Sequence, residues 1–494
     1  MRFNNPIITG FAADPSICFA KGYYYLVNSS FAYFPAIPVF RSKDLVNWEQ
    51  VGNALDSIDE IDTDNLDING GVWAPTIRYL DGVFFICAAV EKVGNLIIHT
   101  FNPEGAWSKP VWVDFGGIDP SLFFEDGKAY FCTNDWSDGR PGVWLGVVDP
   151  YSGQILQDFK CVYRGNDGGW LEAPHIYHIG EYYYLMAAEG GTYSGHMEIV
   201  ARSKDILGPY ENCPMNPILT NRNDTGKAIS CTGHGDLIKT ETGHYYMVHL
   251  GCRPGKLSVS HLGRETFLSP VEFSDGWPVV KGKMAHIENE CDDLVGLQKT
   301  DKSFVDSFTN DKWPVEWRFL RGKGENNFKR QPGCLLAELK DGTSEAFAYV
   351  RQPDLNFECQ VEIIVSGSRL GEGAAAGIRV FLADDFNIFW GIKREKDQYK
   401  LVLDQKADEI KATYLNVDLP QVNGDVVCLK IKGNKDSYAF EASCEGHDSI
   451  SAAVSNRFLS PSVMDRSFVG TMLGIGIIGG EGESSGAFKY IRIN

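Results

Sequence analysis

The sequence predicts an all-β protein in which a five-bladed β-propeller is followed by a β-sandwich. Three observations support this prediction: a phrase that recurs five times, turn dipeptides between short strands, and later strands that lack the phrase. The copies begin at residues 14, 74, 119, 173 and 235, at intervals of 45 to 62 residues. A strand–turn–strand unit repeating at this spacing is typical of propeller blades.

All five copies share one construction. A small or acidic residue, usually followed by proline, precedes an apolar pair, and a glycine with aromatic residues comes next. The copies cover residues 14–25, 74–85, 119–130, 173–183 and, in degenerate form, 235–246. Turns such as Asp81-Gly82 and Asp126-Gly127 separate the apolar runs, as in β-hairpins. Residues 1–290 therefore form the predicted propeller.

The rest of the chain predicts a second domain. At 494 residues the chain is too long for one ordinary core. Polar and acidic residues at 291–303 predict a linker. Within 304–494, runs with period-two alternation lie at 359–365, 377–381, 427–431 and 474–478. These runs predict a β-sandwich.

Composition excludes several classes of partner. A net charge of −19 argues against nucleic acid, an anionic membrane or a polyanionic substrate, and leaves a neutral sugar compatible. No apolar run is long enough to predict a membrane span, and the N-terminus lacks a signal-peptide pattern, so we expect a cytoplasmic protein. The 12 cysteines show no C-x-x-C pair and predict reduced thiols, not disulfides or a zinc site.

Acidic residues stand where the innermost strands begin, near the axis on which the blades converge. They are Asp14, Asp119 and Glu172, with His234 in the fifth copy. Carboxyl groups that share one funnel push their pKa values apart, which provides a protonated acid beside an ionised base. Glycoside hydrolysis uses such a pair. The aromatic residues that could stack on sugar rings are Trp73, Phe31, Phe34 and Trp170.

Each candidate also has a structural interpretation. A single Asp-Pro is usually a turn, but acids at equivalent places in three repeats favour a function. His175 and His178 point to opposite faces of a strand and are interpreted as structural. His234, between two glycines, is suited to close approach of a ligand or ion. Arg253 and Arg264 could each be surface charges.

At these residues the chain resembles glycoside hydrolase family 43, in its two-domain β-xylosidase and α-L-arabinofuranosidase branch. The matching phrases, in family order, are Asn5-Pro6-Ile7-Ile8, Ala13-Asp14-Pro15-Ser16-Ile17, Ser42-Lys43-Asp44-Leu45-Val46-Asn47-Trp48, Val72-Trp73-Ala74-Pro75, Gly117-Ile118-Asp119-Pro120-Ser121, Leu171-Glu172-Ala173-Pro174-His175, Gly233-His234-Gly235-Asp236 and Leu262-Gly263-Arg264-Glu265-Thr266. Two departures stand out: Ala173 replaces a usual glycine, and the loop between Arg253 and Arg264 is short.

The resemblance implies an inverting enzyme that needs no cofactor for its chemistry. Asp14 would be the general base, Glu172 the general acid, and Asp119 the residue that orients the acid and raises its pKa. The two reacting carboxyl groups would lie about 6.5–9.5 Å apart. Arg264 would bind a sugar hydroxyl, and His234 would lie beside a calcium ion or a water cluster.

The resemblance also covers the second domain, as a jelly-roll, concanavalin-like sandwich. In this branch a sandwich loop closes the pocket with an aromatic residue, and Phe468, in residues 466–470, is the candidate. A closed pocket would favour removal of one terminal sugar.

The leading functional hypothesis is an exo-acting β-xylosidase that releases xylose from short β-1,4-xylooligosaccharides. An α-L-arabinofuranosidase, or an enzyme with both activities, is the close alternative, because the same acids serve both. A non-catalytic sugar-binding protein would be expected to lack one of the three acids, and a purely structural scaffold leaves the aligned acids unexplained. Sugar identity, substrate length, metal occupancy and assembly into a homo-oligomer are not determined by the sequence.

Overall fold

The computed structural model describes residues 2–63, 65–224, 226, 228–291, 293–294, 303–322, 325–340, 343–419, 425–461 and 467–494. Nearly all regular structure in these ranges is β-strand, and the helical segments among them are three 3-10 turns, η1 (Lys256–Ser258), η2 (Lys281–Lys283) and η3 (Glu325–Asn327). Membrane-spanning helices are absent from this described part of the chain. Contacts divide the chain into unit 1 (Met1–Pro254 and Arg264–Thr300) and unit 2 (Gly255–Gly263 and Asp301–Asn494).

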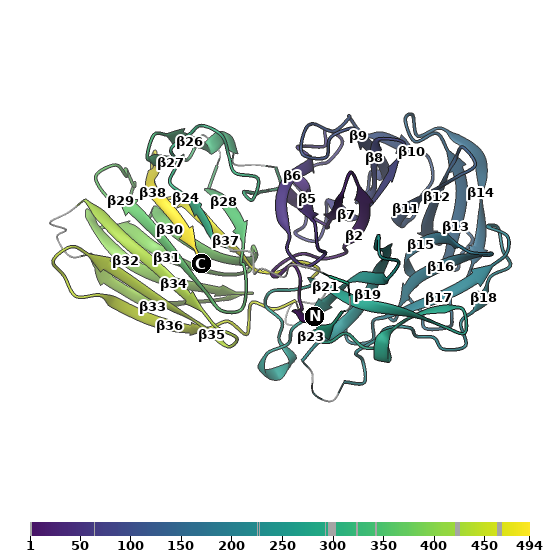
Figure 1. Cartoon of the computed structure of the whole chain (residues 1–494). Coiled ribbons are helices and arrows are strands. Elements are labelled where there is room, and N and C mark those ends of the chain that lie inside the picture. The colour runs from purple at the N-terminus through teal and green to yellow at the C-terminus, as the bar shows by residue number, and fades with distance from the viewer. Residues whose placement is uncertain are drawn as a thin grey trace. The chain divides into compact units, whose positions relative to one another are not determined.

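Five four-stranded sheets form unit 1, which confirms the predicted five-bladed propeller (Figure 1). Each repeated phrase forms the first two strands of one blade, and the first strands β2, β7, β11, β15 and β19 pack side by side around the axis. The blades are, in order, β2 (Ser16–Ala20), β3 (Tyr23–Val27), β5 (Ala36–Ser42) and β6 (Glu49–Leu55); β7 (Val72–Leu80), β8 (Val83–Val90), β9 (Gly94–Thr100) and β10 (Val111–Val113); β11 (Ile118–Glu125), β12 (Lys128–Asp135), β13 (Gly142–Val148) and β14 (Ile155–Tyr163); β15 (Glu172–Ile179), β16 (Tyr182–Glu189), β17 (Met197–Ser203) and β18 (Glu211–Asn212); β19 (Ser230–Lys239), β20 (Tyr245–Cys252), β21 (Glu265–Ser274) and β22 (Trp277–Val280).

The N-terminal segment closes the ring of blades. Strand β1 (Arg2–Asn4) pairs with β23 (Glu288–Glu290), which follows the last blade. The Asn5 side chain donates to the Leu268 carbonyl at 2.8 Å and accepts from the Leu268 N–H at 2.9 Å. The chain that leads into blade 1 is therefore tied to blade 5 by buried hydrogen bonds.

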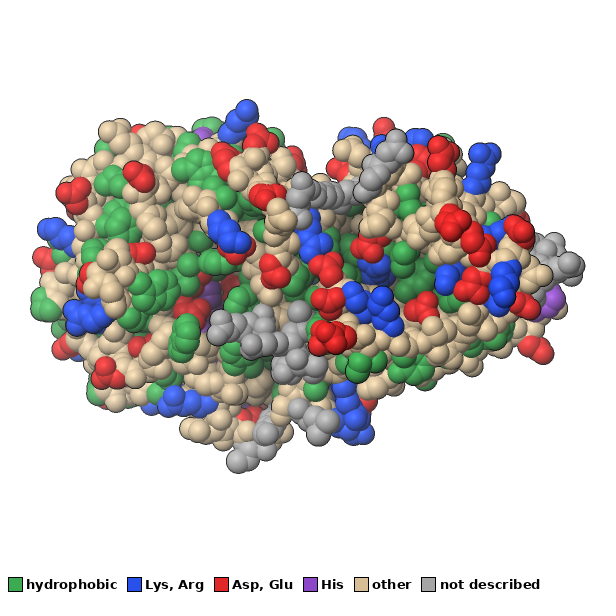
Figure 2. Space-filling model, turned by 180° about the vertical axis from the view of Figure 1, so that it is seen from behind, with side chains coloured by type: hydrophobic (Ala, Val, Ile, Leu, Met, Phe, Trp, Pro, Cys, Tyr) green, Lys and Arg blue, Asp and Glu red, His purple; other side chains and the backbone are tan. Residues whose placement is uncertain are grey.

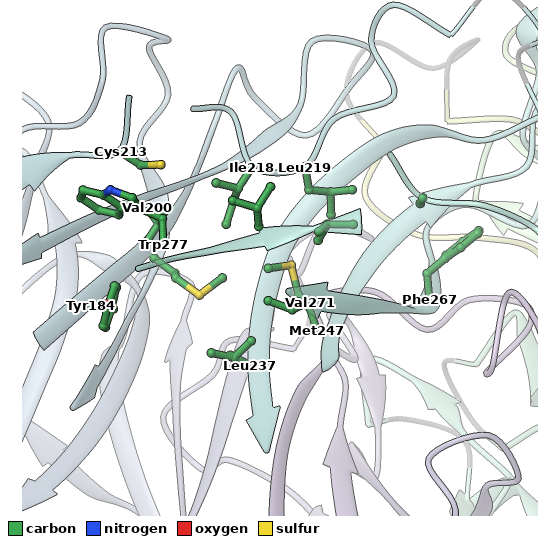
Figure 3. Packing of buried hydrophobic residues seen from close by; sticks show 14 of the residues in the cluster. Tyr184, Val200, Cys213, Ile218, Leu219, Leu237, Met247, Phe267, Val271 and Trp277 are labelled. Carbon is green, nitrogen blue, oxygen red and sulfur yellow. The ribbon is translucent and has the colours of Figure 1, made fainter. Parts of the chain in front are cut away.

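Apolar side chains fill the space between neighbouring blades. Figure 3 shows the cluster between blades 4 and 5, in which Tyr184 and Val200 from one blade meet Leu237, Met247 and Phe267 from the next. Full burial of one such side chain stabilises the fold by about 1.5–3 kcal/mol. The aromatic residues of the repeated phrase therefore act mainly in packing between blades.

Unit 2 is a β-sandwich, as predicted. Trp390 of one sheet and Phe440 of the other meet in its core, with ring centroids 5.9 Å apart. Strands β29, β30, β34 and β37 confirm the four predicted runs. One sheet contains β24 (Phe304–Asp306), β26 (Phe328–Gln331), β27 (Cys334–Glu338), β29 (Phe357–Ile364), β34 (Val426–Gly433), β35 (Ser437–Cys444), β36 (Ile450–Ser455) and β38 (Ser485–Ile493), and the other contains β28 (Glu345–Arg351), β30 (Ala375–Ala383), β31 (Phe386–Glu395), β32 (Gln398–Ala407), β33 (Ile410–Asp418) and β37 (Met472–Ile478). Two short strands remain, β4 (Tyr33–Phe34) and β25 (Phe319–Leu320).

Two details qualify the sequence-based picture of the chain. The segment Gly255–Gly263, between β20 and β21, belongs by its contacts to unit 2, although it lies within the residues predicted as propeller. Most of the predicted linker, including residues 295–302, lies outside the described residues.

On the surface shown in Figure 2, the described Lys and Arg side chains are interspersed with Asp and Glu. The 12 cysteines, all of them described residues, are thiols outside any disulfide.

Candidate active site

The first strands of the blades begin with a repeated backbone irregularity. Register shifts mark β-bulges at the starts of β7, β11, β15 and β19. At equivalent places the backbone of Asp14, Asp119, Ala173 and His234 is left-handed, with φ between 52° and 55°. This conformation is uncommon for residues with a side chain and is often found at functional sites. A bulge redirects side chains locally, and here it gathers polar groups from several blades.

Asp14 is buried, and three side chains lie within 3.5 Å of its carboxylate. Its Oδ2 accepts a hydrogen bond of 2.5 Å from the Ser29 hydroxyl. Its Oδ1 lies 2.8 Å from Nη1 of Arg264 and 3.5 Å from Nδ1 of His234. Burial alone would raise the pKa of Asp14, but Arg264, His234 and Ser29 outweigh burial, and the pKa lies below its ordinary value. Asp14 is therefore an ionised carboxylate at neutral pH.

Asp119 and Glu172 have the opposite electrostatic situation. Asp119 accepts a hydrogen bond of 3.1 Å from the backbone N–H of Ala173, the residue after Glu172. Burial and the charge of Asp14 raise the pKa of Asp119. Burial, followed by the charges of Asp119 and Asp14, raises the pKa of Glu172 from 4.5 to about 8. Glu172 is therefore mainly protonated at neutral pH.

The two pKa displacements give the site its chemical capacity. A carboxylate with a lowered pKa can accept a proton from water, while a carboxylic acid with a pKa near 8 can donate one. An acid–base pair is expected where the surroundings lower the pKa of one carboxyl group and raise the pKa of the other. The site can thus activate water and protonate a leaving oxygen in the same reaction.

The predicted aromatic residues differ in how far they are exposed. The Arg264 guanidinium lies 5.6 Å from the centre of the Phe31 ring. Trp73, at the start of β7, donates from Nε1 to the Asn69 carbonyl at 2.9 Å and stays half-buried. Phe31 and Phe34 are each only 3% exposed. Their rings are therefore packed into the protein, while Trp73 keeps part of its surface open.

Three residues near the acids were missed by the sequence analysis. Ser29 contacts Asp14, and Thr192 Oγ1 accepts a hydrogen bond of 3.1 Å from Nη1 of Arg264. His196 is buried, and burial lowers its pKa to about 3. The signal for Ser29 was available: the second strand of a hairpin ends opposite the start of the first, so residues just after β3 face Asp14.

A buried ion-pair network is formed by residues of the same first strands, in most cases a few residues beyond the start of the strand. Arg78 contacts Asp236 through Nη1 at 2.8 Å and His175 through Nη2 at 2.9 Å. The Ser16 and Tyr177 hydroxyls donate to Asp236 at 2.6 and 2.5 Å. Burial would raise the pKa of Asp236, but Arg78 holds it well below the ordinary value. Four blades are therefore joined by polar contacts, and His175 has the structural role expected of it.

The two arginines considered as surface charges both contact buried carboxylates. Arg253 contacts buried Glu265 through Nε at 2.7 Å and Nη2 at 2.8 Å. Arg264 is 9% exposed. The interpretation of either as a surface charge was wrong, because each has a buried carboxylate as its partner.

The resemblance implies a calcium ion or a water cluster beside His234. Among the described residues, no group of three or more His, Cys, Asp or Glu side chains is placed to hold a metal ion. Calcium takes six to eight oxygen ligands, whereas His234 offers nitrogen and neighbouring Asp14 is already bonded to Ser29 and Arg264. These residues do not fit direct calcium coordination, and the chemistry below uses no metal.

Phe468 belongs to unit 2 and is half-buried there. Arg466, in the same predicted loop, lies outside the described residues. That Phe468 closes the sugar pocket stays a prediction.

Comparison with known proteins gives the family. Residues 3–278 match the model of glycosyl hydrolases family 43, and residues 305–494 match the beta xylosidase C-terminal concanavalin A-like domain. A non-reducing end alpha-L-arabinofuranosidase of Bacteroides ovatus is 34% identical over 486 residues, which cover 96% of this chain and 90% of that protein. A beta-xylosidase of Bacillus subtilis is 33% identical over 395 residues, 74% of each chain.

The solved structure described as Bacteroides ovatus xyloglucan PUL GH43B has a TM-score of 0.91 and 32% sequence identity, and the match covers 100% of both chains. The matched models span both units, and the aligned acids of the propeller lie within the first of them. This chain belongs to glycosyl hydrolase family 43 and is a glycoside hydrolase.

Proposed function

We propose that the enzyme is an inverting exo-glycosidase that removes a terminal pentose, in first place β-1,4-linked D-xylose, from xylooligosaccharides. The observation that supports this proposal is the contrast between the pKa values of two carboxyl groups, that of buried Asp14 and that of half-buried Glu172. The pKa of Asp14 lies below its ordinary value, and that of Glu172 is raised to about 8. Hydrolysis of a glycosidic bond needs one ionised and one protonated carboxyl group at the same time, because a base must activate water while an acid protonates the departing oxygen.

In the proposed reaction, Asp14 accepts a proton from a water molecule whose oxygen attacks the anomeric carbon. Glu172 donates its proton to the glycosidic oxygen as the bond to the anomeric carbon breaks. Attack from the face opposite the leaving group inverts the anomeric configuration. One water is consumed, and after release of both sugars Asp14 returns its proton to solvent and Glu172 regains one.

Asp119 and Arg264 act on these two groups in different ways. The charge of Asp119 raises the pKa of Glu172, and its hydrogen bond to the Ala173 N–H fixes the backbone next to the acid. Arg264 keeps Asp14 ionised and has donors that could bind a sugar hydroxyl. Asp119 is thus a positioning residue, and Arg264 both supports the base and binds substrate.

An α-L-arabinofuranosidase is the second candidate. The Bacteroides ovatus relative, which matches 96% of this chain, is named as an arabinofuranosidase, whereas the Bacillus subtilis relative is named as a xylosidase. The same acid and base serve either pentose. A third possibility is an enzyme that accepts both sugars, because its pocket binds hydroxyl groups that the two pentoses have in common.

The test is paired turnover of an aryl β-D-xylopyranoside and an aryl α-L-arabinofuranoside. We expect preference for the xyloside and loss of activity on both substrates in Asp14→Asn. Glu172→Gln should lose most activity on substrates with poor leaving groups, because these depend on protonation. Preference for the arabinofuranoside would mean that the substrate is an α-L-arabinofuranoside, while the proposed acid–base mechanism would remain the same. If the wild type turns over neither, the proposal fails and a binding role gains support.

A further inference from the structure

Trp170 combines two properties that do not stabilise a fold. Its side chain is 70% exposed, the largest exposure among the exposed large hydrophobic residues of the described chain. Its backbone is left-handed, with φ of 53°, which is a genuine outlier for a bulky residue. Strain of this kind persists where the surrounding structure imposes it, and it is concentrated at functional sites. An exposed ring held at a cost in backbone energy points to a ligand.

The loop that carries Trp170 is built to hold it in place. The buried carboxylate of Glu189, at the end of β16, accepts from the backbone N–H groups of Asn166 at 2.6 Å and Gly168 at 3.0 Å. Gly190 donates to the Gly169 carbonyl at 2.8 Å. The Trp170 ring lies over Gly191, since a Cβ atom there would be 3.6 Å from the ring. The hydrogen bonds of this loop therefore hold the Trp170 ring in an exposed position, where a ligand can contact it.

Trp170 lies close to Glu172, the proposed general acid, in the chain. One residue, Leu171, separates it from Glu172, so the two Cα atoms are at most about 7 Å apart. The Trp170 ring lies over Gly191, and the next residue is Thr192. Thr192 accepts a hydrogen bond from Nη1 of Arg264, which also contacts Asp14, so the ring lies near the acids. An acid protonates the oxygen that departs with the leaving group, so a ring beside the acid faces the sugar on that side of the bond.

Tyr193 and Phe101, two other exposed aromatic residues, lie at different edges of the propeller. Tyr193, 41% exposed, lies on the loop after β16, which also leads to the edge where the first strands begin. Phe101, 68% exposed, follows the third strand of its blade. Because neighbouring strands are antiparallel, Phe101 lies at the opposite edge of the propeller. Phe101 therefore offers a control of equal exposure without access to the site.

We propose that Trp170, together with Tyr193 on the neighbouring loop, forms a stacking platform for the sugar on the leaving-group side of the scissile bond. The platform makes a carbohydrate chain, not a small aglycone, the preferred leaving group. This inference rests on the proposed function and adds to it the part of the substrate that the enzyme recognises. An exposed Trp presents a large rigid surface with an N–H donor at one end, which suits a sugar ring with an apolar face and a hydroxyl rim.

The test compares Trp170→Ala, Trp170→Phe and the control Phe101→Ala with the wild type. The first substrates are oligosaccharides in which the preferred terminal pentose is linked to one, two or three further sugars. The reference substrate is a glycosyl fluoride of the same pentose, which has no sugar in the leaving group. We expect Trp170→Ala to lower kcat/KM on the oligosaccharides about tenfold more than on the fluoride, a difference of about 1.4 kcal/mol. Trp170→Phe should retain most of the activity, and Phe101→Ala should match the wild type.

Binding gives an independent readout. In the Glu172→Gln background, oligosaccharide should shift the tryptophan emission, and Trp170→Phe should remove that shift. Equal losses on the fluoride and the oligosaccharides, or no loss on either, would overturn the platform. Failure of the proposed function is a different result, because the wild type would then turn over neither the fluoride nor the oligosaccharides.

Discussion

Replacing Glu172 with glutamine should make the protein more stable, by an amount that increases with pH. Burial and two neighbouring acids raise the pKa of Glu172 from 4.5 to about 8 in the folded state. Between these two values the unfolded chain has released the proton and the folded chain still holds it. The folded state binds more protons in this window, so the free energy of unfolding falls as pH rises. Glutamine has a similar shape and does not titrate.

The size of the effect follows from the two pKa values. Each pH unit between 4.5 and 8 corresponds to about 1.36 kcal/mol, so the gain of Glu172→Gln is at most about 3 kcal/mol at pH 7 and about 5 kcal/mol above pH 8. At pH 5 the gain is below about 1 kcal/mol. The proposed general acid is thus held protonated at the expense of stability.

Urea unfolding of both proteins at pH 5, 7 and 9 measures this gain. Asp14→Asn is the matched control with the opposite sign, because a lowered pKa contributes stability that is present above the ordinary value of 3.8 and is lost in acid. Asp14→Asn should therefore destabilise the protein by a similar amount at pH 5, 7 and 9, and this loss should shrink only below the ordinary pKa of 3.8. A stability difference for Glu172→Gln that is the same at pH 5 and pH 9 would refute the reasoning, since it would mean that the pKa is not raised.

Three further predictions concern the surroundings of the site. Arg78→Met leaves Asp236 buried without its cation and should lower the free energy of unfolding by about 3–5 kcal/mol, measured by urea titration; an unchanged midpoint would contradict the role of the pair. Ala173→Gly relieves a left-handed backbone with φ of 53° and should stabilise the protein by up to about 1 kcal/mol, seen as a higher melting temperature; a lower one would count against strain at this position. Cys231, whose pKa a hydrogen bond to Cys252 lowers to about 7, should react with iodoacetamide at pH 7 before Cys87 and Cys132, as mass spectrometry of tryptic peptides would show; equal labelling of the three would contradict this.

Much of the fold was predictable because its information is local and repeated. The phrase that contains Asp14-Pro15 and Asp119-Pro120 marks both a blade and its place near the axis, so one pattern gives fold and site together. The resemblance supplied the assignment of Asp14 and Glu172 to base and acid, and burial and charge in the structure give a physical reason for it.

The remaining features depend on contacts between distant segments. Arg264 meets Asp14 across 250 residues, and Arg78 meets Asp236 across 158, and no local pattern reports such pairs. The left-handed backbone of Trp170 is likewise imposed by the loop around Glu189, so the sequence identified the aromatic ring but not its exposure. The grouping of Gly255–Gly263 with unit 2 is also a tertiary fact.

The anomeric configuration of the first product tests the central claim most directly. Proton NMR can follow a β-D-xyloside, or the α-L-arabinofuranoside if the enzyme prefers it, and identify the first anomer before mutarotation. The account predicts that the released sugar first appears with the opposite configuration, because Asp14 activates a water and forms no bond to the sugar. First appearance of the same configuration as the substrate would contradict the account, since it would require a covalent intermediate on a carboxylate.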